Sequence, residues 1–166
     1  MKNTFRTYNR LNASAFDLIS GSTETKQTLG LAYLLSQNHK VLMSFLKLPE
    51  IKRIIGGIRL STFSKVIVHS ELISASNKRA DIVIQLYRND KPEIALIIEA
   101  KTATKKINGK VVIKQLEGYL SKNEFPELDN FKKYGCILTK NDVVIDHKEI
   151  TALSWHHIYE MLNKQG

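Results

Sequence analysis

The apolar and polar residues of this chain recur with periods that predict a succession of helices and strands. Hydroxyl groups and an acid at residues 22–24 can cap a helix, and the apolar side chains that follow spread around much of its circumference. Asn38 can cap a second helix that runs through Leu48 and ends at Pro49. Residues 1–21 lack clear periodicity, and no element is assigned to them.

Three runs of strand length follow these helices. They cover residues 65–72, 81–87 and 94–101, and the turn-rich segment 88–93 joins the last two as a hairpin. The rest of the chain predicts a loop over 102–109, a helix over about 110–122, a strand over 134–138 and a helix over 155–162. This order predicts an α/β fold in which a central sheet is flanked by helices.

Composition is consistent with one folded unit. The 166 residues fit a single domain spanning 1–166, and the 43% hydrophobic and 25% charged residues argue against disorder. The single cysteine, Cys136, excludes an internal disulfide and a thiolate zinc site. No apolar stretch approaches the length that crosses a bilayer, and the N-terminus lacks the pattern of a secretory signal. We therefore expect a cytoplasmic protein with no membrane contact.

The charge of the chain narrows the choice of partner. Lys and Arg exceed Asp and Glu, and the net charge of +9 makes a polyanion such as nucleic acid the favoured partner. A nucleotide cofactor is not expected, because Gly56-Gly57 lacks the Lys-Ser/Thr of a phosphate-binding loop.

Candidate chemistry gathers at the end of the third expected strand. Alternate side chains of a strand share a face, so Glu99 and Lys101 should project together. A carboxylate there can hold a divalent metal, and a neighbouring ammonium can orient water or offset charge during phosphodiester hydrolysis. Glu-x-Lys occurs twice more in the chain, but only this copy ends an apolar strand.

Two further elements converge on the same place. Asp81 begins the preceding strand of the expected hairpin, so antiparallel pairing should bring it beside Glu99 and provide two carboxylates suited to Mg²⁺. Gln115 and Tyr119 are four residues apart on the next helix and share a face. Glu24, in the first turn of the first helix, is a further candidate that could meet the metal directly or through water.

Asp81, Glu99-x-Lys101 and Gln115-x-x-x-Tyr119, in this order and on these elements, resemble the PD-(D/E)XK nuclease superfamily over most of the chain. The Gln-x-x-x-Tyr element is similar to that of RecB-type and lambda-exonuclease-like members. One departure is Ala80, which stands where proline precedes the first acid in the motif.

The resemblance implies a restriction-endonuclease-like core of αβββαβ order, a need for Mg²⁺ or Mn²⁺, and cleavage of DNA phosphodiester bonds, with an endonuclease favoured. Asp81, Glu99 and the Ala100 carbonyl would then bind the metal, joined by Glu24, while Lys101 positions or activates water. Gln115 would support that lysine or a phosphate. Tyr119 would serve packing or the DNA. A homodimer would allow both strands to be cut.

Basic side chains flank this predicted site and are candidates for contact with the DNA backbone. They are Lys78, Arg79, Lys105, Lys106, Lys110 and Lys114. Two alternatives stay open: a nuclease-like module that binds DNA or a protein without cutting, and a nuclease that acts on RNA.

Overall fold

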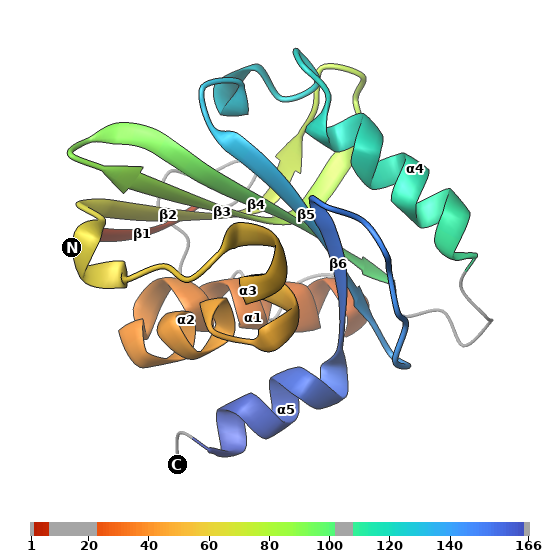
Figure 1. Cartoon of the computed structure of the whole chain (residues 1–166), viewed down its shortest axis with the longest axis horizontal. Helices are drawn as coiled ribbons and strands as arrows, with labels where there is room; N and C mark the ends of the chain where they lie inside the picture. The colour runs from red at the N-terminus through yellow and green to blue at the C-terminus, as the bar shows by residue number, and fades with distance from the viewer. Residues whose placement is uncertain (1, 7–22, 102–107, 165–166) are drawn as a thin grey trace.

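The computed structural model describes residues 2–6, 23–101 and 108–164, and a six-stranded mixed sheet runs through its centre (Figure 1). The strands lie in chain order, with the β2–β3 and β3–β4 pairs antiparallel and the β1–β2, β4–β5 and β5–β6 pairs parallel. They are β1 (Lys2–Arg6), β2 (Lys65–Ile73), β3 (Arg79–Arg88), β4 (Lys91–Lys101), β5 (Lys132–Thr139) and β6 (Ile150–Ser154).

Helices cover both faces of the sheet. Helices α1, α2, α3 and α5 lie on one side and α4 lies on the other, as Figure 1 shows. The helices are α1 (Thr23–Gln37), α2 (His39–Leu46), α3 (Pro49–Ile55), α4 (Gly109–Leu120) and α5 (Trp155–Asn163), with short 3-10 turns η2 (Leu60–Thr62) and η3 (Pro126–Leu128). Within the described ranges, no helix has the length and apolar character needed to cross a membrane.

The predicted fold class is confirmed. The sheet is mixed and flanked by helices, and the αβββαβ order runs from α1 through β2, β3, β4 and α4 to β5. Asn38 caps α2 and Ser154 caps α5, as the sequence predicts.

Two strands and one helix, β1, β6 and α3, were not predicted from the sequence. Strand β1 has a single large apolar residue and is held by its backbone ladder to β2, which leaves little periodicity to detect. Strand β6 has five residues, the last of which also caps α5. The second helix ends at Leu46, and Pro49 opens α3 because proline is well suited to the first helical turn.

The hairpin that joins β3 and β4 is tighter than expected. Its turn is Asn89–Asp90, with φ angles of 49° and 59°, and two central residues of positive φ are typical of a type I′ hairpin turn. From this turn the antiparallel pairing runs to the pair Ile82↔Ile98, with one register shift between Leu86 and Tyr87. Asp81 and Glu99 are the next residues of their strands, so the register carries both to the same end of the hairpin.

The core has two layers, one on each face of the sheet. The α1 layer lies between the sheet and α1, α2, α3 and α5, and its strand residues include Val68, Ile82 and Ile98. The α4 layer lies against α4 and includes Val83 and Ile97. Adjacent residues thus alternate between layers, as a strand covered on both faces requires.

Helix α4 approaches the sheet closely at Gly135 of β5. A Cβ atom placed on this glycine would lie 3.3 Å from both the Leu116 Cδ1 and the Ile150 Cγ1 atoms. The missing side chain therefore lets α4 settle on the sheet, and the position of α4 sets where Gln115 and Tyr119 lie.

We predict that Gly135→Val lowers the free energy of unfolding by about 1–3 kcal/mol, because added methyl groups overpack the contact between α4 and β5. The matched control is Gly118→Ala within α4, where an added Cβ meets nothing within 4 Å. This control should be neutral or stabilising by up to about 1 kcal/mol. Urea unfolding measures both, and equal stability of the two variants would contradict the close approach.

Candidate active site

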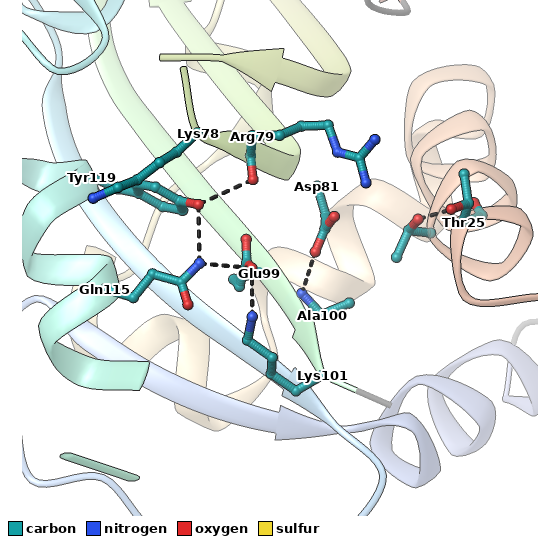
Figure 2. A pocket seen from close by; sticks show the side chains of 10 residues that line it. Thr25, Lys78, Arg79, Asp81, Glu99, Ala100, Lys101, Gln115 and Tyr119 are labelled. Carbon is teal, nitrogen blue, oxygen red and sulfur yellow. Dashed lines mark hydrogen bonds and ion pairs between the residues drawn. The ribbon is translucent and has the colours of Figure 1, made fainter. Parts of the chain in front are cut away.

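A pocket of about 440 Å³ opens where β3 begins and β4 ends, beside α4 and the start of α1 (Figure 2). Its lining is mostly polar and charged, in contrast to the two apolar core layers. The lining residues are Thr25, Thr28, Lys78, Arg79, Asp81, Glu99, Ala100, Lys101, Gln115 and Tyr119.

Glu99 is the most deeply buried carboxylate of this pocket, with 6% of the residue exposed. Its Oε1 atom accepts hydrogen bonds from Lys101 Nζ at 2.7 Å and from Gln115 Nε2 at 2.8 Å. Its Oε2 atom is buried and has no hydrogen-bond partner among the described residues. Because a buried polar atom without a partner is costly, this oxygen is suited to a ligand that the protein itself does not supply.

Asp81 faces Glu99 from the neighbouring strand. Its Oδ2 atom accepts a hydrogen bond from the Ala100 backbone N–H at 2.7 Å, beyond the point where the β3–β4 register ends. Burial, and then the negative charge of Glu99, raise the pKa of Asp81 to about 6, although the Ala100 N–H and the Lys101 ammonium act in the opposite direction. The site therefore brings two carboxylates together against their mutual repulsion.

A directed chain of hydrogen bonds fixes the other side of Glu99. Gln115 Nε2 donates to Glu99 Oε1 and, at 3.0 Å, to the Tyr119 hydroxyl oxygen. The Tyr119 hydroxyl in turn donates to the Arg79 backbone oxygen at 3.0 Å. Since the tyrosine oxygen already accepts from the amide, its own proton is committed to Arg79. Helix α4 thus ties the end of β4 to the start of β3.

Tyr119 is held by packing as well as by hydrogen bonds. Only 2% of the residue is exposed, and its ring meets Phe125 edge to face, with 5.4 Å between ring centroids. Burial raises the pKa of its hydroxyl, which stays a neutral donor. Of the two roles that the sequence suggests for this residue, this placement favours packing over contact with DNA.

The Ala100 carbonyl is aimed toward the same space. In a strand, the N–H and C=O of one residue point to the same side, and the Ala100 N–H points to Asp81. Asp81, Glu99 and this carbonyl are oxygen donors of the type that Mg²⁺ prefers. In the described part of the chain, no three His, Cys, Asp or Glu side chains gather into a metal site. Further ligands would therefore come from the carbonyl, from water or from Glu24.

Several predicted residues lie elsewhere or outside the described part of the chain. Glu24 falls in the first turn of α1, but its side chain is outside the described residues, as are Lys105 and Lys106. Lys110 and Lys114 are exposed on α4 and do not line the pocket.

Two threonines of α1 line the pocket without having been predicted. They are Thr25 and Thr28, and the Thr28 hydroxyl donates to the Thr25 backbone oxygen at 3.0 Å. Thr28 is four residues after Glu24, a spacing that shares a helix face, so this spacing could have suggested Thr28 once Glu24 was a candidate.

The basic residues at the pocket differ in whether their charged groups form ion pairs with acidic side chains. Lys78 and Arg79 both line it and are exposed. Arg79 Nη1 forms an ion pair with Glu71 Oε1 at 3.0 Å, which engages part of its guanidinium. Lys101 Nζ is paired with Glu99, as described above.

No protein-family model matches the sequence, nor does any curated protein. Among solved structures, the chain is similar to the MspJI restriction endonuclease in complex with a 27-mer oligonucleotide, at 12% sequence identity and a TM-score of 0.39. The similarity covers 94% of this chain and 36% of that chain, so this chain spans well under half of that endonuclease. Membership of the PD-(D/E)XK superfamily stays a prediction from the motifs.

The raised pKa of Asp81 predicts a pH-dependent loss of stability in the metal-free protein. At a pH between the ordinary pKa of an aspartate, 3.8, and the raised pKa of about 6, the carboxyl ionises in the unfolded chain but stays protonated in the folded one. Stability should therefore be fully present below pH 4 and fall as the pH rises through 6. In wild type, the resulting loss in the free energy of unfolding is at most about 3 kcal/mol. Asp81→Asn, whose side-chain oxygen can still accept the Ala100 N–H, should not show this loss.

Urea unfolding of both proteins in chelator at pH 4 and pH 7.5 measures this difference, because all other titrating groups are common to the pair. The variant should gain stability relative to wild type as the pH rises. An unchanged difference between the two pH values would show that Asp81 titrates normally.

Proposed function

We propose that this chain is a metal-dependent nuclease that hydrolyses DNA phosphodiester bonds. The observation that carries the proposal is the Glu99 carboxylate, which has one oxygen held by two donors and the other buried with no hydrogen-bond partner in the described part of the chain. Burying two neighbouring carboxylates destabilises a fold, so their retention in a polar pocket favours a functional role.

The donors of the pocket fit a divalent cation such as Mg²⁺ or Mn²⁺. Glu99 Oε2, the Asp81 carboxylate and the Ala100 carbonyl would hold it, with Glu24 a candidate to contribute through water. A bound cation of this kind polarises a phosphate and lowers the pKa of a water molecule. It would also give Glu99 Oε2 a partner, which this atom lacks among the described residues.

Lys101 is suited to orient the attacking water or to offset charge on the phosphate. Its ammonium has three donors, and one of them is committed to Glu99 Oε1. The side chain is 30% exposed, so the remaining donors can meet water or a phosphate in the pocket. Gln115 keeps the Glu99 carboxylate turned so that Oε1 faces the lysine and Oε2 faces away from it.

The charge distribution supports a nucleic-acid substrate. The chain carries a net charge of +9, and Lys78 and Arg79 stand at the pocket while Lys110 and Lys114 are exposed on the adjacent helix. Cations in these positions can contact backbone phosphates, which fixes the position of a strand without reading its sequence.

The direct test incubates supercoiled plasmid with the protein and Mg²⁺, Mn²⁺ or chelator, beside a matched RNA. Nicked or linear DNA that forms with metal and not with chelator supports the proposal. Cleavage confined to RNA would replace DNA by RNA as the substrate. Retention of DNA with no cleavage by any metal would favour a binding module instead.

We predict that Glu99→Gln and Lys101→Met each lower plasmid cleavage by about 100-fold or more, because each removes a charge at the reacting centre. The matched controls are Glu93→Gln and Lys91→Met, which alter the same residue types at the far end of β4. Both controls should cleave like wild type, and fluorescence anisotropy should show that all four variants still bind DNA. Full activity of Glu99→Gln would refute the role of this carboxylate.

A further inference from the structure

Along both β2 and β3, the face of the strand that packs against the α1 layer changes beside the candidate site. In a regular strand, residues two or four apart share a face. Yet Val68 lies in the α1 layer, whereas Leu72 packs against the α4 layer. On the partner strand, Ile82 lies in the α1 layer and Ala80 in the α4 layer. Each strand therefore rotates about its own axis between these residues, so that side chains which should share a face lie on opposite faces of the sheet.

The reversal is centred on Glu71 and Asp81. Ser70 pairs with Ile82 and Leu72 pairs with Ala80, but Glu71 and Asp81, which lie between these pairs, are not paired. Glu71 has a φ of 58°, in the left-handed region that side-chain-bearing residues seldom adopt and that is out of place in a regular strand. The register on either side is continuous, so the irregularity is a local turn of the backbone and not an inserted residue.

The Asp81 carboxylate lies where the pairing of β3 with β4 has ended. Pairing of β3 with β4 stops at Ile82↔Ile98, and the Ala100 N–H donates to the Asp81 side chain at 2.7 Å. Figure 2 shows Asp81 reaching toward the backbone of β4 in this way. The carboxylate thus takes the place that a backbone carbonyl of β3 would occupy if the ladder continued.

Contacts on both sides of Asp81 hold the turned strand. Glu71 Oε1 pairs with Arg79 Nη1 at 3.0 Å across the two strands. The Arg79 backbone oxygen accepts the Tyr119 hydroxyl on the α4 side. The segment that precedes Asp81 is therefore fixed to β2 through Glu71 and to α4 through Tyr119.

We propose that Glu71 is a positioning residue whose left-handed backbone turns β3 so that Asp81 is left out of the backbone ladder and its carboxylate lies beside Glu99 at the proposed metal site. This inference rests on the proposed function, because it assigns Glu71 a part in building that site. The property that matters is the backbone conformation at residue 71, whereas the carboxylate of Glu71 contributes only the ion pair with Arg79.

Three substitutions at one position separate these two contributions. Glu71→Gln, Glu71→Gly and Glu71→Val all remove the charge. Glycine adopts positive φ freely, glutamine has a penalty like that of glutamate, and a β-branched valine strongly favours the extended conformation. The readouts are Mn²⁺ affinity by calorimetry and the NMR shift of the Ala100 amide in the metal-free protein, with the melting temperature followed in parallel.

The glycine variant should bind Mn²⁺ within about twofold of the glutamine variant, whereas the valine variant should bind about tenfold or more weakly. In the valine variant, the NMR shift of the Ala100 amide proton should also change toward the value of an N–H without a hydrogen bond. Equal affinity and an unchanged amide in the valine variant would overturn the inference. If that variant does not fold, Glu71→Ala replaces it: binding weaker than in the glycine variant supports the inference, and equal binding overturns it.

The two proposals fail in different ways. If wild type binds no Mn²⁺, the proposed function is wrong, and the Ala100 amide alone then decides whether residue 71 places Asp81. If wild type binds Mn²⁺ and the valine variant binds it equally well, the metal site stands and the role of Glu71 is wrong.

Discussion

The buried Glu99 carboxylate is the constraint around which the pocket is arranged. A carboxylate with so little exposure destabilises the fold unless its oxygens find donors, and here two donors meet on Oε1 while Oε2 has none among the described residues. The neighbouring Asp81 carboxylate does not compensate for this burial, because its negative charge repels that of Glu99. A divalent cation would resolve both problems together, which connects the energetics of the fold with its proposed chemistry.

The surrounding elements hold this arrangement before any ligand binds. The tight β3–β4 hairpin brings the two acids to one end of the sheet. Close packing of α4 against Gly135 places Gln115 at hydrogen-bond distance from Glu99. The same helix is also bonded to the start of β3, because the Tyr119 hydroxyl donates to the Arg79 backbone oxygen. Hydrogen bonds join Lys101, Glu99 Oε1, Gln115, the Tyr119 hydroxyl and the Arg79 backbone oxygen, so these groups are preorganised and little rearrangement is needed for binding.

The sequence was sufficient to predict what depends on simple periods. Alternation along a strand placed Glu99 and Lys101 together, and the helical repeat placed Gln115 with Tyr119. It could not reveal the Arg79 carbonyl as the end of the hydrogen-bond chain, because a backbone acceptor leaves no mark in the residue pattern. Nor could it reveal the turn at Glu71, where a residue of no special backbone preference is held at positive φ by its tertiary context, or strands β1 and β6, which are short.

The most direct test of the central claim is a crystal structure of the protein soaked in Mn²⁺, with anomalous differences measured at a wavelength where manganese scatters strongly. The account predicts a peak bound by Glu99 Oε2 and the Asp81 carboxylate, beside the Ala100 carbonyl, with Lys101 and Gln115 still on Oε1. An absence of density there at saturating Mn²⁺, with Oε2 bonded to a protein group instead, would contradict it.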